Sequence, residues 1–169
     1  YANTYSPRCG IHNNSTGTVK MTGGEINIET SHWGSALYNA NEGRIEFTDG
    51  KIIIDTGLPG SGIHCGSGTN IMNGGTIYST RRGIYNEKTG SIEVNGGTIM
   101  SERYATEENK GTGGNIVING GVFKIVETSG AKVIENTSPA SVTINGGTFS
   151  AKGSNGIINF GDKGPLNIN

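Results

Sequence analysis

The chain has 169 residues and a formal net charge of −1, so it lacks the excess of basic residues expected of a protein that binds nucleic acid or an anionic membrane. Glycine is abundant, with 30 residues, and proline is scarce, with 4. The hydrophobic fraction is only 32%, and no apolar run approaches the roughly 20 residues that a helix needs to insert in a membrane.

A glycine pair recurs along almost the whole chain, usually between an asparagine and a threonine. The pairs begin at residues 23, 74, 96, 120 and 146, and Asp49-Gly50 fills the gap, so the steps are 22 to 26 residues. A period in this range indicates stacked repeats, none of which can bury its apolar face alone. Glycine without proline at a fixed period also indicates tight turns rather than disorder.

Each repeat contains three short segments in which apolar residues alternate with polar ones, as they do in strands. The first precedes the glycines and points Val19 and Met21 inward, the second follows them with Ile26 and Ile28, and the third contributes Ile11. Later repeats have equivalents of all three, and no window has a helical period. We therefore predict an all-β, right-handed parallel β-helix with about seven coils, forming one domain over residues 1–169.

Two rows of asparagines have a structural interpretation, in which side-chain amides pass hydrogen bonds from coil to coil. One row is expected at a corner after the third strand, and the other lies before the glycines. The first contains Asn13, Asn39, Asn86, Asn109, Asn136 and Asn159, and the second contains Asn73, Asn95, Asn119 and Asn145 with Thr22 and Thr48. Cys65 replaces an asparagine in the first row and should be buried. Cys9 lies about two rungs away, so both thiols are expected to be free.

The third strands also predict a row of outward side chains. In the fifth repeat, Thr106 to Asn109 fits the spacing but puts Glu107 at the aliphatic position. The predicted row is His12, Tyr38, His64, Tyr85, Glu108, Glu135 and Ile158. Its four consecutive rings suit stacking on sugars or packing against another protein. The alternative is that outward aromatic residues simply favour strands and shield the backbone.

A mixed polar and aromatic rim is expected in the loops beside this row. Its candidate binding residues are Trp33, Arg81, Arg82 and Arg103. The arginines could hold an acidic sugar or another carboxylate. The alternative is that they are solvated surface charges.

The segments VTINGGTFSAKGSNGIIN (residues 142–159) and SIEVNGGTIMS (residues 91–101) resemble the right-handed parallel β-helix repeats of the pectate-lyase-like superfamily. They are most similar to β-helix segments of bacterial surface proteins and carbohydrate-binding modules. The resemblance implies the fold and leaves the activity open, since that superfamily includes polysaccharide lyases, glycoside hydrolases, tailspikes and adhesins.

An enzyme of that superfamily would need groups that the sequence does not supply. The Asn-Thr-Asp, Asp-Asp, Gly-His-Gly and Arg-Ile-Lys motifs of its hydrolases are absent. Glu46 and Glu93 should lie roughly 10 Å apart, at the upper limit for an inverting pair of carboxylates. His12 and His64 are equally two rungs apart, too far to share a metal ion, so no catalytic residue, metal or cofactor is predicted.

We therefore expect a non-catalytic extracellular or cell-surface module, bacterial in origin, that serves as a stalk or adhesin and binds a polysaccharide or host glycan. A self-assembling filament subunit is the structural alternative, because Leu166 and Ile168 repeat the inward pair of the first strand and the ends look uncapped. The chain would then be a stacking subunit, and otherwise a segment of a longer protein. A polysaccharide lyase or glycoside hydrolase is the enzymatic alternative.

Overall fold

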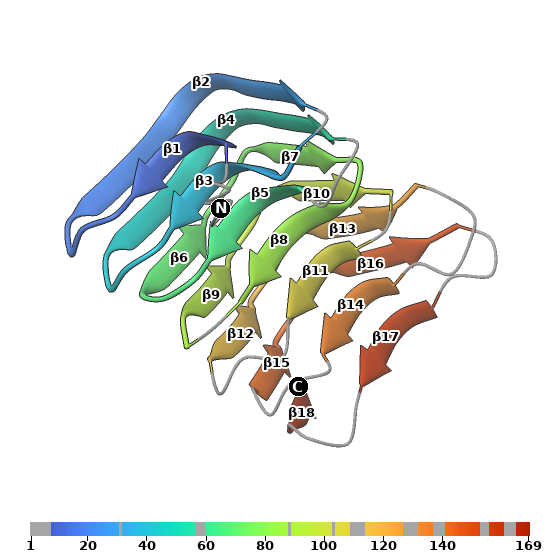
Figure 1. Cartoon of the computed structure of the whole chain (residues 1–169). Coiled ribbons are helices and arrows are strands. Elements are labelled where there is room, and N and C mark those ends of the chain that lie inside the picture. Colours follow the sequence, from blue (N-terminus) through green and yellow to red (C-terminus); the bar gives the residue numbers. More distant parts are fainter. Residues whose placement is uncertain are drawn as a thin grey trace, which may run out of the picture.

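The computed structural model of the chain is a parallel β-solenoid (Figure 1). The structure describes residues 8–30, 32–56, 60–87, 89–102, 104–108, 114–126, 132–136, 141–152, 156–160 and 165–169. Every regular element in these ranges is a strand, and none of them contains a helix long and apolar enough to cross a membrane. The prediction of an all-β solenoid is confirmed.

The strands form two sheets, here called sheet A and sheet B, and every neighbouring pair is parallel. Sheet A has seven strands in the order β1 (Arg8–Asn13), β3 (Gly34–Asn39), β5 (Gly60–Cys65), β8 (Arg82–Asn86), β11 (Tyr104–Glu108), β14 (Lys132–Asn136) and β17 (Gly156–Phe160). Sheet B has 11 strands, namely β2 (Thr18–Thr30), β4 (Arg44–Thr56), β6 (Thr69–Met72), β7 (Thr76–Ser79), β9 (Ser91–Val94), β10 (Thr98–Ser101), β12 (Asn115–Ile118), β13 (Val122–Ile125), β15 (Ser141–Ile144), β16 (Thr148–Ala151) and β18 (Leu166–Ile168).

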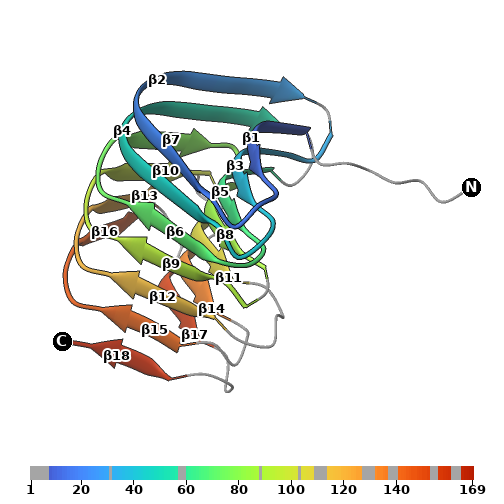
Figure 2. The ribbon, with the colours of Figure 1, turned by 90° about the vertical axis from the view of Figure 1, so that its left-hand side faces the viewer.

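Each coil passes through sheet A once and then through the two arms of sheet B, on either side of the glycine corner. Figure 2 shows the coils stacked in chain order from β2 at one end to β18 at the other. Because β17 is followed only by β18, the last coil is incomplete, and the number of complete coils is smaller than the seven expected.

The first two coils differ from the predicted three-strand pattern. There the two segments of sheet B are one continuous strand of 13 residues, β2 or β4, and β4 pairs with β6 on one arm and β7 on the other. These two corners carry Thr22 and Thr48 where later coils have asparagine. The corner is still present within these strands, since the pairing of β2 with β4 shifts register on both sides of Thr22.

The glycine corners lie above one another as predicted. Gly24, Gly50, Gly75, Gly97, Gly121 and Gly147 all have positive φ, between 76° and 112°. At Gly97 a Cβ atom would lie 2.8 Å from the carbonyl oxygen of Gly74 in the preceding coil. The corner therefore needs glycine both for its backbone conformation and for the close approach of the coils.

The interior is filled by the predicted inward side chains, of which Phe47, Ile52, Ile77 and Ile99 are at most 1% exposed. One coil breaks the pattern, because Asn70 lies between Ile45 and Ile92 at an inward position. It is 1% exposed, and within the described ranges neither of its amide atoms has a hydrogen-bond partner.

The two asparagine rows behave differently. The exposed row is a ladder as predicted, since Nδ2 of one amide donates to Oδ1 of the one before at 2.9 Å or less for Asn95, Asn119, Asn145 and Asn169. At the buried corner the prediction of an amide ladder is wrong. Asn13, Asn39 and Asn86 donate instead to backbone carbonyls of their own turns, namely those of Gly17, Gly43 and Gly90. These carbonyls lie inside the turn, where the amide satisfies them in place of water.

The predicted alignment of the third strands holds as far as Ile84 and is then wrong by one residue in two coils. Thr106, not Glu107, lies opposite Ile84, and Ile158, not Ile157, lies opposite Ile134. The positions in register with Tyr85 are therefore Glu107, Glu135 and Asn159 instead of Glu108, Glu135 and Ile158. The corner positions fall on Glu108 and Phe160, and Asn109 lies outside the described residues.

Candidate functional site

Four adjacent strands of sheet A bring the predicted rings together. His12, Tyr38, His64 and Tyr85 lie opposite one another on β1, β3, β5 and β8. Their ring centroids are 4.9, 4.4 and 4.9 Å apart in that order, and the angles between the ring planes are 15°, 28° and 46°. The first three rings are stacked and Tyr85 joins them at a tilt, and the four side chains are here called the ring row.

The ring row becomes more buried along the chain. His12 is exposed, Tyr38 and His64 are half-buried, and Tyr85 is only 4% exposed. Tyr85 was predicted to be exposed, and that is wrong because the Arg82 guanidinium lies over its ring, with Cζ 4.3 Å from the centroid. Within the row the rings cover one another's faces, so they offer mainly edges to a ligand. Burial also raises the pKa of Tyr38, and the charge of Glu87 adds to this effect.

A second row runs beside the rings on the same strands. It consists of Cys9, Ser35, Ser61 and Arg82, which lie opposite one another in register. Both serines are 3% exposed and Arg82 is 9% exposed. Arg82 was expected in a loop but belongs to β8. Burial raises the pKa of the Cys9 thiol to about 11, so this thiol is protonated at neutral pH and is a poor nucleophile.

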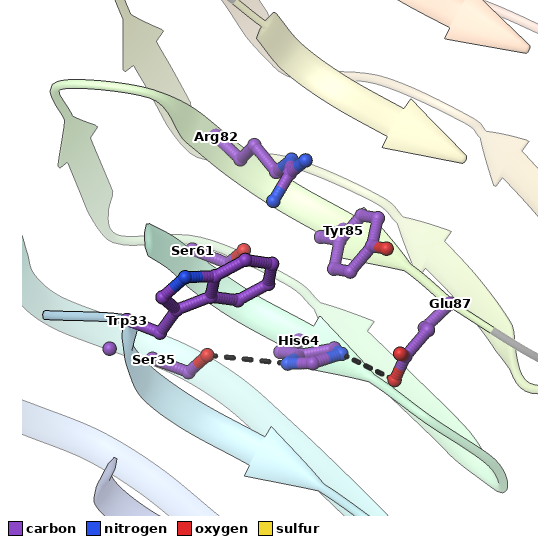
Figure 3. A pocket seen from close by; sticks show the side chains of 8 residues that line it. Trp33, Ser35, Ser61, His64, Arg82, Tyr85 and Glu87 are labelled. Carbon is purple, nitrogen blue, oxygen red and sulfur yellow. Dashed lines mark hydrogen bonds and ion pairs between the residues drawn. The ribbon is translucent and has the colours of Figure 1, made fainter. Parts of the chain in front are cut away.

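The two rows enclose a hollow, to which the turn before β3 and the turn after β8 contribute. It is lined by Trp33, Gly34, Ser35, Ser61, His64, Arg82, Tyr85 and Glu87 (Figure 3). Trp33 is 54% exposed, and Figure 3 shows its indole on the side of the hollow opposite Tyr85. The hollow has a volume of about 40 Å³, enough for roughly three water-sized groups and not for an enclosed sugar ring.

Three of the lining residues are connected by hydrogen bonds. The Nε2 atom of His64 lies 3.1 Å from Oε2 of Glu87, and its Nδ1 atom lies 3.3 Å from Oγ of Ser35. When the imidazole is neutral, the Glu87 carboxylate can only accept, so Nε2 carries the proton. Nδ1 then accepts a hydrogen bond from the Ser35 hydroxyl.

The structure unites part of the predicted site. Trp33, His64, Arg82 and Tyr85 meet at the hollow, whereas His12 and Tyr38 extend the ring row away from it. Arg81 lies in the turn before β8, where its carbonyl oxygen accepts a hydrogen bond from Ser101 Oγ at 2.6 Å, and it does not line the hollow. Arg103 lies outside the described residues.

Ser35, Ser61 and Glu87 were missed by sequence reasoning. A signal for the serines was present, since Gly-Ser precedes both Tyr38 and His64 by the same spacing, in Gly34-Ser35 and Gly60-Ser61. Glu87 follows the corner asparagine of its coil, and no repeat of the sequence marks it.

Metal ligation and paired carboxylates receive no support from the geometry. In the ranges that the structure describes, no three His, Cys, Asp or Glu side chains are grouped so as to hold a metal ion. Glu46 bonds Lys20 and Arg44, and these hydrogen bonds lower its pKa. Its strand position is separated from that of Glu93 by Ile71, as predicted.

No family model, curated protein or solved structure matches this chain. The functional argument therefore depends on the site itself.

Proposed function

We propose that this β-solenoid is a bacterial cell-surface module that serves as a stalk or adhesin and binds a glycan at the hollow of sheet A. The observation that carries the proposal is the exposed indole of Trp33 beside buried polar groups. A flat apolar ring next to a few fixed hydrogen-bonding groups is the combination that orients a sugar.

The contacts suggest how a glycan would lie. Since the rings of the ring row cover one another, the Trp33 indole offers the larger open ring surface, and a sugar would stack there. The hollow would then receive one substituent of the sugar, because it is too small for more. Arg82 and Glu87 line it together, so both acidic and neutral glycans are candidates.

The remaining parts of the proposal rest on the fold and on the resemblance of its repeats. Stacked coils joined by parallel strands make a stiff body, as a stalk requires. The likeness of residues 91–101 and 142–159 to surface-protein segments of the pectate-lyase-like superfamily supports an extracellular, bacterial location.

The test is a glycan array followed by titration of each hit. Trp33 is the only tryptophan of the chain, so its fluorescence reports directly on the hollow. We expect a hit to change this fluorescence and Trp33→Ala to weaken its binding at least tenfold. Tyr78→Ala, which removes an aromatic ring from sheet B, serves as the control and should leave affinity unchanged. Equal affinity of the Trp33→Ala protein, or an array without a hit, would overturn the proposal.

A further inference from the structure

We propose that Ser35 is the nucleophile of an acyl-ester hydrolase site, with His64 as its base and Glu87 as the group that orients the base. The Ser35, His64 and Glu87 side chains come from β3, β5 and the turn after β8, and their hydrogen bonds measure 3.3 and 3.1 Å. A hydroxyl within reach of an imidazole that a carboxylate holds from its other nitrogen is the arrangement that activates serine. This inference goes beyond glycan binding and does not depend on it.

The base is held more firmly than a surface histidine. The imidazole of His64 lies between the rings of Tyr38 and Tyr85, at centroid distances of 4.4 and 4.9 Å, and its side chain is 14% exposed. With both nitrogens also hydrogen-bonded, the ring cannot turn without losing contacts on every side. Such preorganisation is what distinguishes a catalytic constellation from a chance contact.

The hollow selects the substrate class. Its volume of about 40 Å³ matches an acetyl group and leaves no enclosed room for a long acyl chain. Because Ser35 is only 3% exposed, the acyl carbon must enter the hollow to reach Oγ, while the alcohol part of the ester stays at the mouth beside Trp33. The geometry thus points to acetyl esters of hydroxylated carriers.

Ser35, His64 and Glu87 can carry out each step of the ester hydrolysis. Oγ of Ser35 bonds to the acyl carbon as its proton passes to Nδ1 of His64, and the developing oxyanion lies in the hollow that Arg82 helps to line. The ester C–O bond then breaks, and the leaving alcohol takes the proton from Nδ1. Water next attacks the acetyl-serine with His64 again as base, which releases acetic acid and restores Ser35. Glu87 accepts the hydrogen bond from Nε2 and stabilises the imidazolium through it.

The closing experiment measures hydrolysis of 4-nitrophenyl acetate by the full chain. We expect Ser35→Ala to lower kcat/KM at least 100-fold, Glu87→Gln to lower it at least tenfold, and 4-nitrophenyl octanoate to react at least tenfold more slowly than the acetate. Ser79→Ala, which removes another buried serine hydroxyl outside the hollow, should leave the rate unchanged.

A second measurement keeps the test valid if the Ser35→Ala protein does not fold. The unaltered protein is treated with a fluorophosphonate, and the modified peptide is identified by mass spectrometry. Phosphonylation of Ser35 supports the proposal. Hydrolysis no faster than in buffer, labelling at another residue, or equal rates for the folded Ser35→Ala and Ser79→Ala proteins would each overturn it. None of these outcomes depends on whether a glycan binds at Trp33.

Discussion

The thiol of Cys65 takes the place that the amide of Asn39 has in the preceding coil. The two residues lie opposite each other in sheet A, and both side chains point to backbone carbonyls of their own turn and of the next coil. Nδ2 of Asn39 reaches Gly43, four residues on, whereas Sγ of Cys65 reaches Gly68, three residues on, at 3.9 Å. The smaller side chain accompanies a turn that is shorter by one residue, which Gly68 closes with a φ of 74°.

This burial predicts how stability depends on alkaline pH. It raises the pKa of the Cys65 thiol from 9.0 to about 12 and that of Cys9 to about 11. A thiol whose pKa is raised by folding leaves stability unchanged below pH 9, where both states hold the proton. Between pH 9 and 12 the unfolded chain releases protons that the folded chain keeps, so the free energy of unfolding should fall as pH rises.

The measurement is urea denaturation at half-unit steps from pH 7 to pH 11, with a Cys9→Ser, Cys65→Ser variant for comparison. The unaltered protein should lose stability more steeply above pH 9 than the variant does. Parallel pH profiles would show that the thiols do not contribute. Because the thiols are protonated at neutral pH, they should also react with a disulfide reagent at pH 8 mainly after unfolding.

Asn70 offers a substitution that should stabilise the fold. Its amide is buried without partners between Ile45 and Ile92, and a buried polar group that makes no hydrogen bond costs about 1–3 kcal/mol. Asn70→Val should therefore raise the free energy of unfolding by about 1–2 kcal/mol, measured by urea denaturation. The reciprocal change in the next coil, Ile92→Asn, should lower it by more than 3 kcal/mol, roughly the cost of the lost apolar contact and the new unpaired amide together. A destabilised Asn70→Val protein would mean that the amide has a role that the hydrogen bonds do not show.

The sequence was sufficient for the fold because every coil repeats the same physical solution. The glycine at positive φ, the alternating apolar residues and the exposed asparagines each recur at one place per coil. An ambiguous alignment in one coil can therefore be settled from the equivalent residues of the other coils. The alignment failed where only one signal was left. In β11 the corner asparagine suggested a register that the strand pairing contradicts by one residue, and such a shift exchanges the two faces of a strand.

The candidate site could be predicted only in part, for a related reason. The ring row follows the repeat and was visible in the sequence, but the contact from Ser35 to His64 runs diagonally between coils, and Glu87 reaches the same ring from a turn. The repeat places Ser35 opposite Ser61 and Tyr38 opposite His64, so no spacing in the sequence pairs Ser35 with His64. The burial of Tyr85 likewise depends on the direction of the Arg82 side chain, which alternation alone does not specify.

The two asparagine rows should differ in energy, because one is exposed and the other is buried. Asn119 exchanges hydrogen bonds with Asn95 and Asn145 at the surface, where water can replace them, so Asn119→Ala should cost about 1 kcal/mol. Asn39 is 0% exposed and bonds the carbonyl oxygens of Gly43 and Thr69, so Asn39→Ala should cost about 2–3 kcal/mol by leaving buried acceptors unpaired. Urea denaturation of both variants checks the order, and an equal loss of stability would contradict it.

The stacked glycine corners make a sharper prediction, because Gly97, which packs on a preceding coil, and Gly23, which belongs to the first described coil, have opposite requirements. Gly97 has a φ of 91°, and a Cβ atom there would lie 2.5 Å from Cε of Met72 and 2.8 Å from the carbonyl oxygen of Gly74. Gly97→Ala should therefore destabilise the protein by at least about 1–2 kcal/mol from backbone strain alone, with the clash adding to it. At Gly23, where φ is not positive and a Cβ atom would meet nothing within 4 Å, alanine should be tolerated or slightly stabilising. Thermal unfolding of the two proteins decides the matter: if Gly23→Ala lowered Tm as much as Gly97→Ala does, the corner would depend on something other than the left-handed conformation and the close approach of the coils.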